Sequence, residues 1–295
     1  MREMSIQEEP IRHFERPGKR VLDLRKLGVP FVPVLSVSNP PKAMPGPTSL
    51  HVHRGCVEIV YCVRGANFSF ETPERDYPFL PRTVFVSRED EPHRLSFNPN
   101  GHFVYRVLVA LPRDGGRFAG ATAAESAWLR NAMFALPRAF RVRDESVRLA
   151  FERLFACYDE PVPTARQSVL LRTAAYDLLF AVLAASERTA EDRRDPVVVR
   201  WMKRIEDQPE ADFDFAAMSA DAKLPPGVFA SRFAAVAGLP PRTFRNACRV
   251  RKAQRLLEQG ASVTETAFAL RFCSSQHFTK IFKRETGRSP SEWRK

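Results

Sequence analysis

Short apolar runs separated by turns dominate the first third of the chain, between Val21 and Leu111. The runs read FVPVLSV, VEIVYCV, NFSF, TVFVS, HRLSF and HFVYRVLVAL, with turns expected at Arg64-Gly65, Thr72-Pro73 and Asn98 to Gly101. Six or more strands at this spacing, with no helical pattern between them, are typical of a β-barrel or a β-sandwich. The preceding residues 1–20 are charged, and we expect them to fray.

Apolar residues recur at helical spacing from about Ala123 onwards. Two helices are marked by Trp128, Leu129 and Met133 and by Val147, Phe151, Leu154 and Phe155. The third and longest, Arg166 to about Ser186, has a broad apolar face made of Leu170, Leu171, Ala174, Leu178 and Leu179. This face either packs against the β-rich domain or contacts a second copy of the chain. The charged run Ser186–Pro196 has no apolar anchor and is predicted to be a linker.

The last 30 or so residues, Ser262 to Trp293, predict two short helices and a tight turn. Ser262 and Glu265 form an S-x-x-E capping box, which marks a helix start. A second helix is expected from about Ser274, and Gly287 stands where its C-cap is expected. Two short helices joined by a turn of three or four residues make a helix-turn-helix.

The same pattern occurs once before, 49 residues earlier in the chain. Five core or cap positions of the C-terminal copy, Phe278, Phe282, Gly287, Pro290 and Trp293, correspond to Phe229, Phe233, Gly238, Pro241 and Phe244. Matches at one constant offset indicate a duplicated unit. Between the copies lies the basic segment RVRKAQRLL, Arg249 to Leu257, which has apolar residues on one side of a helix.

This arrangement resembles the DNA-binding domain of the AraC/XylS transcription regulators. In that family two helix-turn-helices are joined by a linker helix, and ALRFCSSQHFTKIFKRETGRSPSEW is similar to the family's C-terminal signature. The resemblance covers roughly Asp214 to Lys295. It implies helix-turn-helices over about 214–236 and 262–284 and a linker helix over about 241–258.

The distribution of charge supports contact with nucleic acid. Of the formal net charge of +12, the segment Lys223–Lys295 contributes +11, because it carries 15 Lys and Arg but only 4 Asp and Glu. A basic protein without a phosphate partner would spread this excess over the chain, whereas a DNA-binding domain concentrates it.

Exposed side chains near the start of the second helix of each unit are the usual base readers. The DNA-binding residues predicted here are Ser231, Arg242, Arg245, Arg271, Ser274, Ser275, Gln276, Lys280 and Lys283. Gln can pair bidentately with adenine and Lys can reach guanine, so Gln276 and Lys280 suit base recognition. The matching positions of the first unit, Gly227, Ala230 and Ser231, offer no long donor and predict poor base recognition. The alternative is that these residues form a solvated polar face.

Three positions depart from the family's pattern. The family usually has Gly in the turn, where this chain has Lys223 and Arg271. A positive φ would cost each of them on the order of 1 kcal/mol relative to Gly. Contact of the basic side chain with a phosphate would offset that cost, and the alternative is a turn that needs no positive φ. Arg232 stands where the family usually has an apolar residue, and its direction is left open.

A second motif lies in the β-rich domain. His51, His53, Glu58 and Gly65 read H-x-H-x4-E-x6-G, and His93 follows in EPHRLSFN. This resembles the two cupin motifs, and AraC-type regulators commonly carry a cupin-like sensor domain. The resemblance implies that His51, His53, Glu58 and His93 bind a divalent transition metal or an effector. Imidazole and carboxylate groups suit Fe, Mn, Ni or Zn.

The second cupin motif is incomplete. The glycine expected before the histidine is missing from Arg88 to His93, and Arg54 lies close to the proposed ligands in sequence. Two alternatives to a metal site therefore stay open: a pocket for an organic effector, and simple core packing.

These patterns predict an α+β chain of two domains. We expect a cupin-like β-barrel over residues 1–122, a helical connecting or dimerisation region over 123–188, a linker over 189–196, and an all-α double helix-turn-helix domain over 197–295. The five cysteines form no C-x-x-C pair and are expected to be unpaired thiols. We find no signal peptide and no run of 18 apolar residues, so we expect a cytoplasmic, nucleoid-associated protein with no membrane span.

The resemblance implies a sequence-specific transcription regulator, an activator by the family's habit, and not an enzyme. Its partners would be double-stranded promoter DNA, RNA polymerase, a second copy of the chain, and a small-molecule effector such as a sugar or another small metabolite. The alternative is a metal-dependent cupin isomerase or oxygenase with a nucleic-acid-binding tail. That reading calls for a complete second cupin motif and an acid/base residue, and the sequence shows neither.

Overall fold

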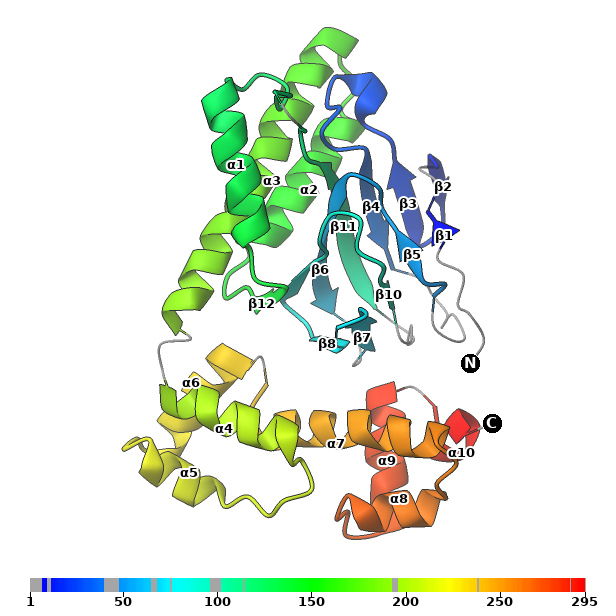
Figure 1. Ribbon diagram of the computed structural model, residues 1–295, viewed down its shortest axis with the longest axis vertical. Helices are drawn as coiled ribbons and strands as arrows, with labels where there is room; N and C mark the ends of the chain where they lie inside the picture. The colour runs from blue at the N-terminus through cyan, green and yellow to red at the C-terminus, as the bar shows by residue number, and fades with distance from the viewer. Residues whose placement is uncertain are drawn as a thin grey trace. The chain divides into compact units, whose positions relative to one another are not determined.

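The computed structural model describes residues 7–9, 12–39, 48–64, 68–74, 76–95, 102–113, 115–192, 196–237, 239–286 and 288–294. The chain divides into two compact units, Met1–Thr189 and Ala190–Lys295. The first unit combines sheets with helices and the second is helical (Figure 1), which confirms the expected α+β class. The turns predicted at Gly65 and at Asn98 to Gly101, and the glycines Gly238 and Gly287, lie outside the described residues.

The described strands of the first unit form three sheets. The largest has the antiparallel order β12 (Ala139–Arg141), β9 (Thr83–Val86), β6 (Cys56–Arg64), β11 (Phe103–Ala110), β4 (Val34–Ser38), β3 (Lys19–Leu22) and β2 (Phe14–Arg16). A second sheet has the order β10 (Arg94–Leu95), β7 (Phe68–Glu71) and β8 (Asp76–Phe79). In the third, β1 (Gln7–Glu8) pairs in parallel with β5 (His51–Val52). Closure of these strands into a cupin-like barrel stays a prediction.

Within the N-terminal segment expected to fray, the described residues 7–9 and 12–20 include paired strands. The sequence suggested a charged, loose segment, but β1, β2 and β3 all pair with neighbouring strands within the first 22 residues. β2 and β3 pair with each other, whereas β1 pairs with β5 and β3 also pairs with β4. The side chains of the segment alone do not predict these last two pairings, because their partners lie elsewhere in the chain.

The two faces of the largest sheet have different roles. Along β11, Tyr105 and Val107 are buried in the main core, whereas Arg106 and Leu108 point to the opposite face, as strand alternation requires. The helices α1 (Ala123–Ala135), α2 (Ser146–Asp159) and α3 (Thr164–Asp192) cover the Tyr105 face (Figure 1). A short 3-10 helix, η1, spans Arg25–Leu27. The face opposite the helices carries Arg106, which lies next to the residues of the cupin-like motif.

α3 is longer than the sequence predicted. It continues to Asp192, so the first part of the charged run Ser186–Pro196 is helical. Ser186 and Thr189 are buried, and the Thr189 hydroxyl donates to the carbonyl of Arg141 at 2.6 Å. Ser186 and Thr189 are not apolar and are separated by charged residues. The sequence pattern therefore predicted a linker here and did not indicate a buried side of a helix.

The broad apolar face of α3 packs inside its own unit. Leu171, Leu178 and Leu179 are fully buried in the main core together with residues of the large sheet. Of the two alternatives for this face, packing against the β-rich domain is the one that the structure shows. By length and composition alone α3 could cross a membrane, but the same burial is typical of the core helix of a globular domain.

The second unit contains the helices α4 (Pro196–Asp207), α5 (Phe215–Asp221), α6 (Pro226–Ala237), α7 (Pro241–Glu258), α8 (Val263–Ala269), α9 (Ser275–Thr286) and α10 (Pro290–Arg294). The capping box at the start of α8 is formed, since the Glu265 amide donates to the Ser262 hydroxyl and the Ser262 amide donates to Glu265. α7 is a single continuous helix that contacts both helix-turn-helices.

The two helix-turn-helices have separate cores of the same design. In the first, the rings of Phe233 and Phe244 meet edge to face at 5.5 Å, and in the second Phe282 and Trp293 do so at 5.7 Å. α5 and α8 are equally long, but the turn after α8 is one residue longer than the turn after α5. The aromatic pairs confirm the duplicated core positions inferred from the sequence.

Candidate DNA-binding surface and candidate metal centre

The second helix of the C-terminal unit, α9, is held by one apolar side and presents polar residues on the other. Phe278, Ile281 and Phe282 are buried in the core of this unit. The Ser274 hydroxyl accepts a hydrogen bond from the His277 amide at 3.0 Å and so caps the helix. Ser275 is half-buried, and the other polar residues of the predicted surface are exposed: Gln276, Lys280 and Lys283.

Both turns adopt the backbone conformation for which glycine is the usual residue. φ is 52° at Lys223 and 53° at Arg271, so the left-handed conformation considered from the sequence is present at both positions. Both side chains are exposed. Each turn therefore carries local strain together with a positive charge directed to solvent.

The first unit presents a different surface. Gly227 and Ser231 are exposed and Ala230 is half-buried, so short side chains line the part of α6 that corresponds to Gln276 and Lys280. A Cβ atom added at Gly227 would meet no atom within 4 Å, and the packing of the protein therefore does not require glycine there. Arg232 is exposed and turned away from the core, which settles the direction left open by the sequence.

Two arginines of α7 that the sequence assigned to DNA lie in different environments. Arg242 is exposed, and its guanidinium lies 5.5 Å from the centre of the Phe215 ring. Arg245 is half-buried and donates to the carbonyls of Pro209, at 3.1 Å, and Ala211. Burial lowers the pKa of Arg245, and the nearby Asp212 opposes this shift while Arg271 adds to it. Arg245 therefore ties the loop before α5 to α7.

Arg249, one turn further along α7, has a similar structural role that the sequence did not suggest. Its Nε donates to the same Pro209 carbonyl at 3.1 Å, and its guanidinium lies 5.1 Å from the centre of the Phe272 ring. Burial and the neighbouring Arg245 lower the pKa of Arg249 to about 10. Two of the positive charges on α7, those of Arg245 and Arg249, thus attach the loop before α5 to this helix.

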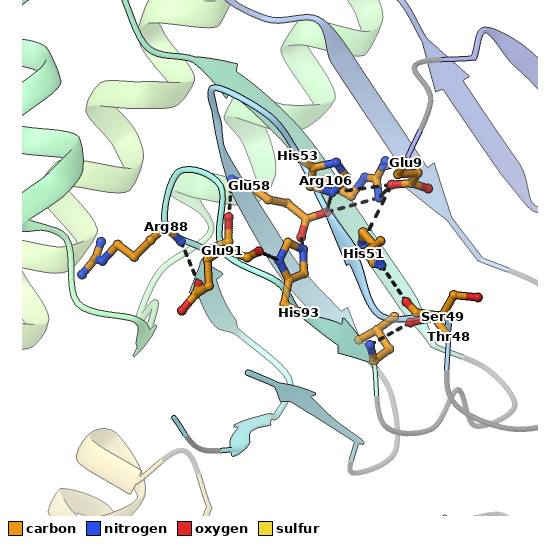
Figure 2. Close-up of polar contacts among 12 residues, drawn as sticks. Glu9, Thr48, Ser49, His51, His53, Glu58, Arg88, Glu91, His93 and Arg106 are labelled. Carbon is orange, nitrogen blue, oxygen red and sulfur yellow. Dashed lines mark hydrogen bonds and ion pairs between the residues drawn. The ribbon is translucent and has the colours of Figure 1, made fainter. Parts of the chain in front are cut away.

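The cupin-like motif residues converge in the first unit. His51 and His93 form an isolated backbone bridge, with N–H···O distances of 3.0 and 2.9 Å, and this pairing places the two imidazoles side by side. His53 follows two residues after His51, on the same side of the strand. The ligand atoms of the three histidines lie within 4.8 Å of one another (Figure 2).

Glu58, on β6, completes the cluster. Its carboxylate lies 2.8 Å from His93 Nε2 and 3.6 Å from His53 Nε2, and its side chain is 2% exposed. Arg54, whose proximity to the motif raised doubt, is exposed and so turns away from this buried group. The structure therefore brings together all four residues that the resemblance assigned to a site.

The hydrogen bonds around the histidines suit metal ligands. Nδ1 of His51 lies 2.9 Å from the Ser49 carbonyl, and Nδ1 of His93 lies 2.9 Å from the Glu91 carbonyl (Figure 2). Donation through Nδ1 leaves the lone pair on Nε2 free, which is the usual second-shell arrangement of a metal-binding histidine. Among the described residues, Nε2 of all three histidines is buried without a hydrogen bond of good geometry. The donor set therefore fits a divalent transition metal.

Two further residues of the cluster escaped the sequence analysis. Arg106 Nη1 lies 3.2 Å from Glu58 and 3.0 Å from Glu9, and Glu9 lies 3.5 Å from His53 Nε2 (Figure 2). Glu9 follows β1 and Arg106 lies on β11, so both are remote from the H-x-H-x4-E motif. Charge complementarity alone could not have found them, because the chain has many other Glu and Arg residues.

Besides binding a metal, the cluster can form an ion pair between His93 and Glu58. Although burial opposes ionisation, His93 and Arg106 hold the pKa of Glu58 well below its usual value. Burial likewise opposes a charge on His93, but Glu58 outweighs it and raises the pKa of His93. Without a metal, a protonated His93 paired with Glu58 can therefore neutralise the buried carboxylate.

Comparison with known proteins identifies the C-terminal domain. Residues 218–295 match a family model described as a helix-turn-helix domain. The chain is 35% identical over 95 residues to the HTH-type transcriptional regulator MtrA of Neisseria gonorrhoeae, an alignment that covers 32% of each protein. It is 45% identical over 58 residues to the HTH-type transcriptional activator RhaS of Escherichia fergusonii, covering 19% of this chain and 21% of RhaS.

Among solved structures, the chain is similar to the DNA-binding domain of AdpA in complex with a target DNA. It is 30% identical to this chain, with 33% of this chain and 88% of that chain covered and a TM-score of 0.31. The chain spans about a third or less of the length of the curated relatives that it matches.

The C-terminal part of the chain is therefore a helix-turn-helix domain of the AraC type, which confirms the resemblance inferred from its sequence. The proteins that match it are transcription regulators rather than enzymes. The alignments with these two relatives cover 32% and 19% of the chain, and the cupin-like resemblance of the β-rich unit stays a prediction.

Proposed function

We propose that this protein is a sequence-specific DNA-binding transcription regulator whose β-rich unit binds a small-molecule effector. The observation that carries the proposal is the α9 helix of an AraC-type domain, which is anchored by Phe278 and Phe282 and exposes Gln276 and Lys280. An amide and an ammonium group on the free side of such a helix can contact base edges in a major groove. The alternative of a merely solvated polar face would not require the surrounding positive charge.

The two helix-turn-helices would contact the same face of the DNA. In this proposal α6 and α9 enter successive major grooves, about one helical turn or roughly 34 Å apart, because the continuous helix α7 fixes their separation. Lys283, Arg271 and Arg242 are exposed and would contact phosphates, whereas Ser274, Ser275 and Ser231 would add shorter contacts. Binding should therefore weaken steeply as salt rises.

Several finer features of the proposal rest on the resemblance to AraC/XylS regulators. They are activation rather than repression, promoter DNA as the target, contact with RNA polymerase, association into a homodimer, and a place in the cytoplasm with the nucleoid. A dimer would use a surface other than Leu171, Leu178 and Leu179, since these residues are buried in the unit's own core. The metal-dependent enzyme considered from the sequence is not proposed, because the matched relatives are regulators.

A thiol footprint tests the proposal on the unmodified protein. Cys273 is exposed beside α9, with its Sγ 3.0 Å from His277 Nδ1, whereas Cys157 is half-buried and the other three cysteines are buried. A duplex recovered by selection from random-sequence DNA should slow the alkylation of Cys273 by N-ethylmaleimide. It should leave the slower alkylation of Cys157 unchanged, and Cys157 is therefore the internal control.

Two results would count against the proposal. One is a selection that yields no enriched sequence and no gel shift at low salt. The other is an enriched duplex that binds but leaves the alkylation rate of Cys273 unchanged, because the bound DNA would then lie away from α9.

A further inference from the structure

A cavity of about 300 Å³ opens beside the histidine cluster, on the face of the large sheet opposite the helices. Strands β2, β3, β4 and β11 line it, and Glu9 closes it on the side of the cluster. This volume is at the lower end of the roughly 300–1,000 Å³ typical of small-molecule pockets. The cavity can therefore hold one small metabolite.

The cavity wall is cationic. Arg12, Lys19 and Arg106 line it, and Glu9 is its only acidic lining residue among the described ones. Lys19 has no carboxylate within 4 Å in the described part of the chain, and its pKa is lowered by burial and by the nearby Arg106. Two basic groups that repel each other across a cavity favour an anion placed between them.

Arg106 lines the cavity and has one N–H group without a hydrogen-bond partner among the described residues. Its Nη1 contacts both Glu9 and Glu58, but its buried Nε has no hydrogen-bond acceptor among the described residues. A guanidinium binds a carboxylate best in a two-point arrangement through two N–H groups. Glu9 is more exposed than the other members of the cluster, at 38% against 2% for Glu58, so it is the acid that an incoming carboxylate can replace.

The rest of the wall is apolar. Val21, Val34 and Leu108 are buried side chains that form one small cluster with Phe14 at its edge. An inorganic anion would leave this surface in contact with water. A ligand with both a charged group and a hydrocarbon part covers both halves of the wall.

We propose that this cavity binds a small organic carboxylate, with its charged group between Arg106 and Lys19 and its hydrocarbon part against Val21, Val34 and Leu108. In the absence of ligand the Glu9 carboxylate occupies Arg106, and the ligand competes with it. The inference rests on the proposed function, since it names the chemical class of the effector. It does not require a metal in the histidine cluster.

Titration calorimetry and thermal shift on the full chain test the ligand class. The probes are hexanoate and benzoate, their neutral counterparts hexanamide and benzamide, and inorganic phosphate. The carboxylates should bind about tenfold more tightly than the amides, because hydrogen bonds between two charged groups are the stronger ones. Phosphate should bind more weakly than hexanoate. Equal binding of acid and amide, or no binding of either acid, would overturn the proposal, as would phosphate binding as tight as that of hexanoate.

Three variants test the contributions of Lys19 and Glu9 to ligand binding. Lys19→Met should weaken hexanoate binding about tenfold while hexanamide binding stays the same, since only the charge contact is lost. Lys26→Met, an exposed lysine outside the cavity, is the matched control and should change neither. Glu9→Gln should tighten hexanoate binding several-fold, because the competing carboxylate is gone. If Lys19→Met behaves like Lys26→Met, or if Glu9→Gln weakens binding, the assignment is wrong.

These measurements do not depend on DNA. If the carboxylates bind as expected but the chain selects no DNA sequence, the regulator proposal fails and the ligand class stands. If the chain selects DNA but distinguishes no acid from its amide, only the ligand class fails.

Discussion

Lys223 and Arg271 occupy equivalent positions in the two helix-turn-helix turns and share a left-handed backbone, with φ of 52° and 53°. Neither residue has a local reason to adopt this conformation, which costs an L-residue roughly 1–2 kcal/mol. Both side chains are exposed next to the helix that would meet DNA. The same strained position, occupied twice by a basic residue, favours a role in phosphate contact.

We expect Arg271→Gly and Arg271→Ala to separate strain from charge. Gly should leave the free energy of unfolding unchanged or raise it by up to about 1 kcal/mol, because relief of strain is partly offset by the flexibility of Gly in the unfolded state. Ala keeps the strain and should not stabilise. Both should weaken DNA binding to the same extent and lower its salt slope by about 1. Chemical denaturation and salt-dependent gel shifts measure these effects, and undiminished DNA binding in both variants would exclude the phosphate contact.

Arg242 and Arg245 should differ although both lie on the basic linker helix. Arg245→Ala removes the donor to the Pro209 and Ala211 carbonyls and should cost about 1–3 kcal/mol of stability. Arg242→Ala, at an exposed site, should change stability by less than about 0.5 kcal/mol. It should weaken binding to all DNA sequences alike through a lost phosphate contact. Urea denaturation measures the free energy of unfolding of both variants. Equal values would show that the hydrogen bonds of Arg245 do not contribute to stability.

The two helix-turn-helices should contribute unequally to sequence recognition. Gln276→Ala or Lys280→Ala should relax specificity in one half of the site at a cost of about 1–3 kcal/mol, because each removes a side chain that reaches base edges. Ser231→Ala, the matched change in the first unit, should leave sequence preference nearly intact. Selection of binding sites from random DNA compares the variants. Equal information content in both halves of the site selected by the wild type would contradict the asymmetry.

Metal content should decide between the two states of the histidine cluster. If His51, His53, Glu58 and His93 bind a metal, the purified protein should carry about one equivalent of a transition metal and lose it on His53→Ala. Chelator should then lower the melting temperature, since a ligand bound only to the folded state stabilises it. His13→Ala, at a half-exposed histidine outside the cluster, is the control. Metal-free protein whose melting temperature does not respond to chelator would indicate the His93–Glu58 ion pair instead.

The sequence by itself determined the helical domain. The capping box of Ser262 and Glu265, the 49-residue repeat and the apolar spacing of Phe278 and Phe282 are local signals, and local signals decide where short helices begin and which side they bury. The residues of the histidine cluster were indicated by the resemblance to the cupin motifs, in which His51, His53 and Glu58 lie on adjacent segments.

Only the tertiary structure decided which groups complete these sites. Glu9 joins Arg106 because β1 pairs with β5 across more than forty residues, and no local pattern specifies that pairing. The carbonyls of the loop before α5 give the half-buried Arg245 a structural role that the sequence did not suggest. In each case the deciding interaction is a polar contact between remote segments, where the fold, and not the residue type, determines which of many similar charges meet.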